Sequence, residues 1–162
     1  IDPLRLAVMG PSAGGNLAAA VAILARQRGG PAICQQVLMV PAMDATLASP
    51  SLKENGTGYD LTEDYIHIAW DLYLGKDGRR DDPLASPLHE PDLTGLPPAH
   101  VVVAEFDPIR DDGVRYAERL QRSDVPVKLS RYPMGHSVMT PEVAGDYLGA
   151  VLSELAAGFT GK

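Results

Sequence analysis

The topology of this protein follows from residues 4–16, which have the sequence LRLAVMGPSAGGN. The first part is nearly all apolar and predicts a strand, Leu4–Met9, that is covered on both faces. It runs into Gly10–Gly14, a G-x-S-x-G pattern, and then into a predicted helix, Asn16–Arg28. A strand that enters a helix through this pattern is typical of a nucleophile elbow, with Ser12 exposed at the apex. The alternative is a glycine-rich turn whose serine caps the helix.

The predicted helix has a clear end and an apolar face. Gly29-Gly30-Pro31 is a typical stop signal. The apolar face is expected to contain Leu17, Val21, Leu24 and Ala25.

Three further apolar runs predict the rest of a sheet. They lie at Gln36–Val40, Pro98–Ala104 and Val125–Tyr132. The last run alternates and carries Lys128 and Arg131, which suit an exposed edge. Together with the helices between them, these runs indicate an α/β fold with a parallel sheet of about four strands flanked by helices.

Two later helices are expected, each with a recognisable start. The first begins at Asp111 or Asp112, either of which can cap it, and continues to about Arg122. The second begins at Thr140-Pro141, a cap followed by proline at the first helical position. Its apolar stripe is formed by Val143, Tyr147, Leu148, Val151, Leu152 and Leu155.

Residues 45–96 interrupt the alternation and form the least regular part of the chain. This excursion contains a predicted helix from about Thr62 to Leu74. A long insertion beside the strand ends usually builds one wall of a binding site. The candidates for that wall are Tyr65, Ile66, Ala69 and Trp70, although the same spacing also fits the buried face of an ordinary helix.

Composition narrows the classes of function. The 162 residues include 14 Lys and Arg against 21 Asp and Glu, and the formal net charge is −7. An acidic chain repels nucleic-acid phosphates and anionic lipid headgroups, which argues against nucleic-acid and membrane-surface binding. Cys34 is the only cysteine, no Cys/His spacing suits a metal, and the apolar run Leu17–Ala25 is too short to span a bilayer. These features favour a soluble, cytoplasmic protein.

A serine hydroxyl is a weak nucleophile and needs a neighbouring base. Of the four histidines, His67 falls in the excursion helix, His89 in a proline-rich loop and His100 inside a strand. His136 follows the last predicted strand, so in a parallel sheet it emerges at the same edge as Ser12. His136 is therefore the predicted base, in the chain order Ser, acid, His.

The base needs a carboxylate that fixes its tautomer and stabilises the imidazolium. Asp107 follows the strand Pro98–Ala104 and is expected at the same edge. Its rivals are Asp44, which follows the second strand, Glu105, which lies near a strand end, and Asp111, which suits a helix cap. The sequence favours Asp107 as the acid and leaves Asp44 as the main alternative.

Motifs spread over nearly the whole chain point to a known family. They are Ile1-Asp2-Pro3, Gly10–Ala18, Glu54-Asn55, Ser86-Pro87-Leu88, Asp92–Pro98, Glu105–Asp111 and Arg131-Tyr132-Pro133. Together they resemble the hormone-sensitive-lipase-like family of α/β-hydrolases, a group rich in bacterial esterases. The resemblance implies that Ser12 is the nucleophile, Asp107 the triad acid and His136 the base. It also implies hydrolysis of small carboxylic esters with short acyl chains, no metal or cofactor, and a homodimer in many members.

The chain departs from the family pattern in several places. Pro11 stands where Asp or Thr is usual, Ser137-Val138 follows the base where Gly-Phe is usual, and the loop before His136 is one residue shorter. The His-Gly-Gly-Gly loop, the N-terminal lid and the first strands of the family fold have no counterpart in this sequence. Residues 1–162 are therefore expected to be the C-terminal part of an α/β-hydrolase domain, with the Ala13 amide as its one oxyanion donor.

Three hypotheses follow. The leading one is a serine esterase that works through an acyl-enzyme. The second is a hydrolase-fold module that binds a ligand without catalysis, against which the retained His136 argues. The third is a partial catalytic domain that is inactive without its N-terminal half.

Overall fold

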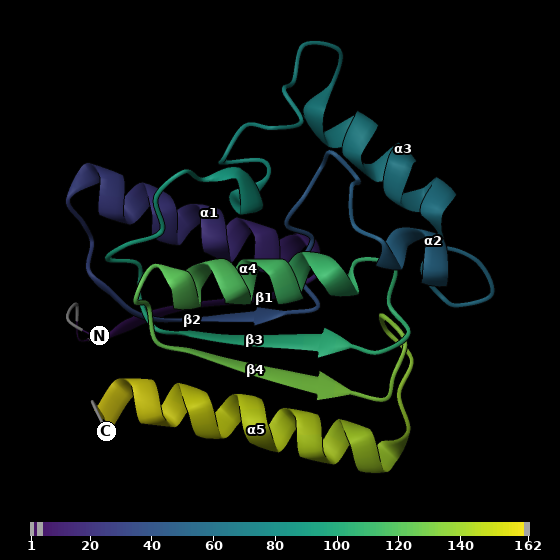
Figure 1. The fold of residues 1–162 in the computed structure, drawn as a ribbon. Coiled ribbons are helices and arrows are strands. Elements are labelled where there is room, and N and C mark those ends of the chain that lie inside the picture. Colours follow the sequence, from purple (N-terminus) through teal and green to yellow (C-terminus); the bar gives the residue numbers. More distant parts are fainter. Residues whose placement is uncertain (1, 3–4, 161–162) are drawn as a thin grey trace.

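A computed structural model describes residue 2 and residues 5–160 of the chain. Within this part, four strands form one parallel sheet in the order β1-β2-β3-β4 (Figure 1). The strands are β1 (Leu6–Pro11), β2 (Ile33–Met39), β3 (Ala99–Ala104) and β4 (Val127–Tyr132). The predicted parallel α/β sheet is confirmed. Ile1, Pro3 and Leu4, which belong to a predicted motif and a predicted strand, lie outside the described residues.

Helices cover both faces of the sheet. The helices α1 (Ala13–Arg28) and α4 (Arg110–Arg122) lie against one face, and α5 (Pro141–Thr160) lies against the other (Figure 1). The excursion contributes α2 (Ser51–Asn55), α3 (Glu63–Leu74) and a short 3-10 helix, η1 (Pro87–His89). The sequence predicted α1, α3, α4 and α5 but not α2 or η1, which are too short to show a helical period.

The alternation of side chains along β2 and β3 divides the core into two layers. Leu38 and Val101 face α1 and α4, whereas Val37 and Val102 face α5. All four are fully buried, and their neighbours in the first layer include Ile23 of α1 with Tyr116 and Leu120 of α4. The central strands are therefore apolar on both faces, as buried parallel strands require.

The predicted apolar face of α1 is partly wrong. Leu17 and Val21 are 53% and 47% exposed, whereas Ala18, Ala22 and Ile23 are buried. The small alanine side chains let α1 pack closely on the sheet, so the contact face is richer in alanine than in large residues. The buried face of an alanine-rich helix therefore cannot be predicted from the positions of large apolar side chains.

Two details of the later helices also differ from the predictions. The N-cap position of α4 is Ile109, and both Asp111 and Asp112 lie inside the first turn, so neither caps the helix. In α5, Tyr147 and Val151 are buried as predicted, but Leu148 and Leu152 are 54% and 65% exposed. The buried stripe of α5 is narrower than the sequence indicated because only one sheet face contacts it.

The edge strands differ in how well they were predicted. β4 lies at one edge of the sheet, as its charged side chains indicated. β1 lies at the other edge, and its residues are mostly half-buried, with Met9 48% exposed. The expectation that this strand is covered on both faces is therefore wrong for the described residues. In the same residues, no helix is both long enough and apolar enough to cross a membrane.

Candidate active site

Ser12 occupies the sharp turn between β1 and α1. Its φ of 52° and ψ of −120° lie outside the regions that L-residues usually adopt. Its amide donates to the carbonyl of Met39 at 2.8 Å, which ties the turn to β2. Ser12 stands at the N-cap position of α1, but its side chain makes no capping hydrogen bond. The capping alternative therefore does not describe this serine, and its hydroxyl engages a group outside the helix.

Glycines allow the turn to close this tightly. A Cβ on Gly10 would lie 2.3 Å from the carbonyl carbon of Gly14, and a Cβ on Gly15 would lie 2.8 Å from the Cβ of Pro41. Pro11 ends β1 in register with Met39, and the end of an edge strand tolerates proline. Proline at position 11, where the family usually has Asp or Thr, is therefore compatible with a sharp strand-to-helix turn.

His136 joins the serine to a carboxylate. Its Nε2 lies 2.9 Å from Ser12 Oγ, and its Nδ1 lies 2.8 Å from Asp107 Oδ2. The side chain of His136 is 9% exposed and that of Asp107 is 1% exposed. The geometry fits a neutral imidazole that donates from Nδ1 to Asp107 and accepts the Ser12 hydroxyl proton at Nε2. Three residues from three separate loops therefore meet at the carboxyl edge of the sheet.

The loop after β3 holds Asp107 from several sides. Its second carboxylate oxygen accepts the amide of Ile109 at 2.9 Å. The side chain of Asn55 donates to the Asp107 carbonyl at 3.2 Å, so α2 supports the backbone of this loop. A buried carboxylate with these partners has a defined orientation toward His136.

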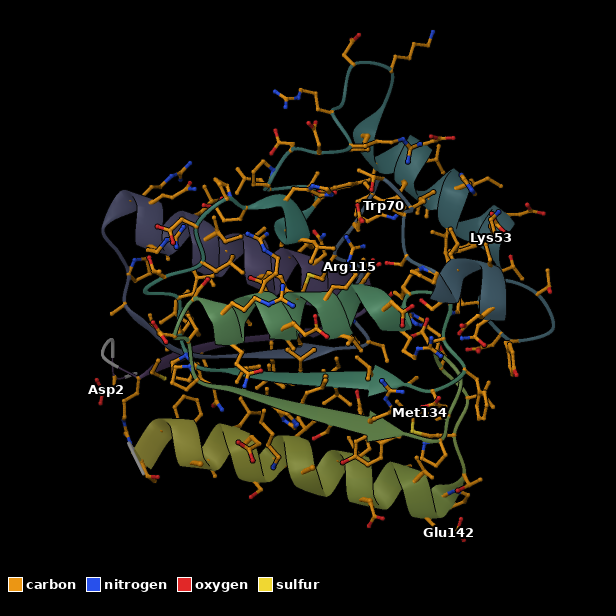
Figure 2. The ribbon with its side chains drawn as sticks, viewed as in Figure 1. Asp2, Lys53, Trp70, Arg115, Met134 and Glu142 are labelled. Atoms are coloured by element: carbon orange, nitrogen blue, oxygen red, sulfur yellow. The ribbon has the colours of Figure 1, made fainter. Side chains whose placement is uncertain are left out.

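The rival carboxylates have other partners. Asp44 contacts His89 at 2.9 Å and Arg115 of α4 (Figure 2) at 3.3 Å, and Glu105 contacts Arg131 at 3.2 Å. Asp111 accepts the amide of Ser51, which ties α4 to α2. The structure thus brings Asp107, and not Asp44, Glu105 or Asp111, to His136.

The remaining histidines lie away from Ser12. His67 is an exposed residue of α3 that faces Glu63 at 3.6 Å. His100 is fully buried in β3, where its Nε2 pairs with Ser130 Oγ at 2.9 Å. Burial lowers the pKa of His100, so this residue favours its neutral form.

A buried pair of carboxylates lies beside the site. Asp112 of α4 accepts the amides of Met43 and Asp44 at 3.0 and 3.1 Å and also contacts the Ser49 hydroxyl. Burial raises the pKa of Asp112 to about 7, and the nearby Asp44 adds to this effect. Burial acts in the same direction on Asp44, but hydrogen bonds with Thr46 and His89 outweigh it and hold the pKa of Asp44 below its usual value. The pair thus favours one protonated and one ionised carboxyl group.

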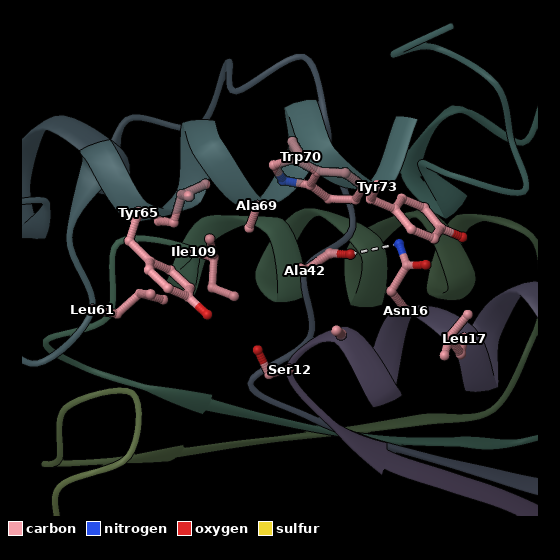
Figure 3. A pocket seen from close by; sticks show the side chains of 12 residues that line it. Ser12, Asn16, Leu17, Ala42, Leu61, Tyr65, Ala69, Trp70, Tyr73 and Ile109 are labelled. Carbon is pink, nitrogen blue, oxygen red and sulfur yellow. Dashed lines mark hydrogen bonds between the residues drawn. The ribbon is translucent and has the colours of Figure 1, made fainter. Parts of the chain in front are cut away.

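A cavity of about 320 Å³ opens beside the Ser12 hydroxyl (Figure 3). It is lined mainly by apolar and aromatic side chains from α1, α3 and the loops around them. The lining includes Ala13 and the four predicted wall residues Tyr65, Ile66, Ala69 and Trp70. Ile66 and Trp70 are also buried against neighbouring residues, so this face of α3 lines the cavity and packs at once.

Sequence reasoning missed several residues of the site. Leu17, Leu61, Tyr73 and Ile109 line the cavity, and of these only Leu17 lay in a predicted apolar stripe. Asn16 of α1 donates to the carbonyl of Ala42 at 2.7 Å (Figure 3) and to that of Ala85 at 2.6 Å. These contacts join segments far apart in the chain, so no local pattern could have indicated them.

Comparison with known proteins places this geometry in context. The family model described as alpha/beta hydrolase fold matches residues 1–140. Carboxylesterase NlhH of Mycobacterium tuberculosis is 45% identical over 136 residues, which cover 82% of this chain and 42% of that protein. The chain therefore spans less than half the length of this relative.

Solved structures of esterases are also similar to this chain over about half of their length. A thermostable esterase from Pseudomonas putida ECU1011 has a TM-score of 0.91 and is 36% identical, with 96% of this chain and 51% of that chain covered. A structure described as bacterial heroin esterase has a TM-score of 0.92 and is 34% identical, with 98% and 53% covered. In both cases this chain corresponds to about half of the solved structure.

Proposed function

This chain belongs to the alpha/beta hydrolase fold family, within the esterase group that resembles hormone-sensitive lipase, and on that premise we propose that it hydrolyses carboxylic esters with Ser12 as nucleophile. The observation that carries the proposal is the continuous pair of hydrogen bonds from Ser12 through His136 to Asp107, at 2.9 and 2.8 Å. Because these distances are short and the groups are largely buried, proton transfer needs little rearrangement.

The reaction begins when Ser12 Oγ attacks the ester carbonyl carbon. His136 Nε2 takes the hydroxyl proton as the new C–O bond forms, and Asp107 stabilises the resulting imidazolium. The tetrahedral intermediate expels the alcohol, which receives the proton from Nε2, and leaves an acyl group on Ser12. Water then attacks the acyl carbonyl carbon while His136 Nε2 accepts its proton. As the acyl–oxygen bond breaks, Nε2 returns this proton to Ser12 Oγ, and the carboxylic acid departs.

The developing oxyanion needs hydrogen-bond donors. The Ala13 amide, at the start of α1, is the donor that this proposal assigns, because it follows the nucleophile and lies at the positive end of a helix. Each oxyanion donor typically contributes about 10² to 10³ in rate. We infer that residues 1–162 supply the nucleophile, base, acid and one pocket wall of the longer domain found in the relatives.

The cavity beside Ser12 supports a small apolar group on the ester. Its volume of about 320 Å³ suits a short acyl chain. Its mainly apolar lining offers few hydrogen-bond partners to an acyl chain that carries polar groups. The proposal also places this activity in the cytoplasm, as the acidic composition and the single cysteine favour.

A burst experiment tests the proposal. With p-nitrophenyl butyrate, we expect a rapid release of about one equivalent of nitrophenol followed by slower turnover, because the acyl-enzyme accumulates. Mass spectrometry should find the butyryl group on Ser12. Ser12→Ala should abolish the burst, whereas Ser153→Ala, at an exposed position of α5, should retain it.

Equal bursts from wild type and Ser12→Ala would remove Ser12 from the mechanism. Ligand binding without any burst would favour the non-catalytic module.

A further inference from the structure

Asp60, in the excursion, contacts the loop that carries His136. One carboxylate oxygen of Asp60 accepts the His136 amide at 3.1 Å, and the other accepts the Ser137 amide at 2.6 Å. The excursion and the loop after β4 are 76 residues apart in the chain at this contact. A single exposed carboxylate therefore joins the segment beside the cavity to the backbone of the candidate base.

The loop is shaped to receive this carboxylate. A Cβ on Gly135 would lie 2.6 Å from Asp60 Oδ1, so a larger residue there would displace the side chain. The Gly135 amide donates to the carbonyl of Val138 at 2.9 Å, which closes a turn around His136 and Ser137. Two consecutive amides within this turn thus donate to the two oxygens of one carboxylate, an arrangement that fixes both partners.

Met134 and Met139 anchor the His136 loop at its two ends, because both side chains pack in the layer between the sheet and α5. The side chain of Met134 is buried between the sheet and α5 (Figure 2), and its carbonyl accepts the amide of Phe106 at 3.1 Å. Between Met134 and Met139, the hydrogen bonds that the structure describes from the loop to a distant segment are those of Asp60 and those of the His136 ring itself. The backbone position of the ring therefore depends on Asp60.

Neighbours of Asp60 link the same segment to the other parts of the site. Tyr59 stacks on Phe106, with ring centroids 5.5 Å apart and an interplanar angle of 13°. Phe106 directly precedes Asp107, and Leu61 lines the cavity. Residues 59–61 thus contact the loop of the acid, the loop of the base and the pocket, in that order.

We propose that Asp60 is a positioning residue, which holds the loop 135–138 so that the His136 ring lies in line with both Ser12 and Asp107. The inference rests on the proposed ester hydrolysis. Because Asp60 is exposed, we expect its removal to affect the alignment of the ring more than the stability of the fold.

Two measurements test the inference. The first is the rate at which a fluorophosphonate modifies Ser12, and the second gives kcat and KM for p-nitrophenyl butyrate. Asp60→Ala should lower the modification rate and kcat about tenfold and change KM less than about twofold, because ground-state binding does not use the base. Asp60→Asn, which keeps one acceptor oxygen, should give an intermediate loss.

Two further variants control the experiment. Asp64→Ala removes a neighbouring exposed carboxylate in the first turn of α3 and should leave the rate and the melting temperature unchanged. Gly135→Ala should reproduce the loss seen in Asp60→Ala, and the double variant should be no worse than either single one, because both remove the same contact. Additive losses would overturn the inference.

The outcomes separate the two proposals. If the wild type is not modified at Ser12 and shows no turnover, the proposed ester hydrolysis fails, and the role of Asp60 fails with it. If the wild type reacts but Asp60→Ala and Asp60→Asn react at the same rate, only the role of Asp60 is overturned.

Discussion

At the scale of single residues, the proposed mechanism depends on a choice between two buried carboxylates. Asp107 and Asp44 both follow central strands, and both are almost fully buried beside a histidine. The difference lies in which histidine. Asp107 contacts His136, which reaches Ser12, whereas Asp44 contacts His89 of η1, whose side chain is 34% exposed.

Matched substitutions separate the two carboxylates. Asp107→Asn keeps an acceptor for the Ile109 amide but loses the charge that orients and stabilises the imidazolium. We expect kcat to fall on the order of 10³- to 10⁴-fold. Asp44→Asn should change kcat less than about threefold, although it loses its ionic contact with Arg115. Steady-state kinetics on samples with equal folded fractions, measured by circular dichroism, make the comparison. The reverse ranking would assign the acid to Asp44.

At the scale of elements, the turn from β1 into α1 is the most demanding piece of backbone. Gly10→Ala places a Cβ against backbone atoms of Gly14, which cannot move without distorting the helix start. We expect the free energy of unfolding to fall by roughly 3 kcal/mol or more. Urea unfolding monitored by tryptophan fluorescence measures this change.

A second glycine in a helix provides the control. Gly149 of α5 has no atom within 4 Å of an added Cβ. Gly149→Ala should therefore raise the free energy of unfolding by about 0.5–1 kcal/mol, because alanine loses less backbone entropy in a helix. Equal losses from both substitutions would show that steric contact at the turn is not the cause.

The two sides of α3 should also differ in their effect on catalysis. Tyr65 lines the cavity, whereas Leu72 of the same helix is 80% exposed and does not line it. Tyr65→Ala should raise KM for p-nitrophenyl butyrate roughly three- to tenfold with little change in kcat, because it removes contact with the bound ester. Leu72→Ala should leave both constants unchanged. A fall in kcat alone for Tyr65→Ala would argue for a role of Tyr65 in the reaction itself.

The sequence predicted the elements better than their contacts. The strands, the elbow and four helices follow local periodicity, and the structure contains them nearly where they were expected. The packing face of α1 was misassigned because alanine carries a weak apolar signal, and the short α2 and η1 carry no period at all. The contact of Asp60 with the His136 loop depends on tertiary structure, which a single sequence does not encode locally.

At the scale of the whole molecule, the buried pair Asp44 and Asp112 links stability to pH. The pKa of Asp112 is about 7 in the folded protein, against 3.8 for an ordinary aspartate. Between these values the folded state keeps a proton that the unfolded state releases. The contribution of Asp112 to stability is therefore fully present below about pH 4 and is lost as the pH rises to about 7, with a slope of at most about 1.4 kcal/mol per unit.

Asp112→Asn isolates this effect. In an asparagine, the side-chain oxygen accepts the two backbone amides and the nitrogen takes the place of Oδ1 beside the Ser49 hydroxyl, so it copies the protonated aspartate. The difference in unfolding free energy between Asp112→Asn and wild type should grow in favour of the variant from pH 4 to pH 7 and then level off. Urea titrations at several pH values measure the difference. A constant difference would mean that Asp112 keeps an ordinary pKa.

The Asn16 amide has a consequence for how such a site diversifies. By holding the carbonyls of Ala42 and Ala85, it secures the segment between them to the start of α1 at both of its ends. Residues 62–84 within this segment, which include α3 but neither Asn55 nor Asp60, can be exchanged, lengthened or redesigned while the turn around Ser12 keeps its shape. A grafted segment would then alter which esters are accepted without rebuilding the chemistry beneath it.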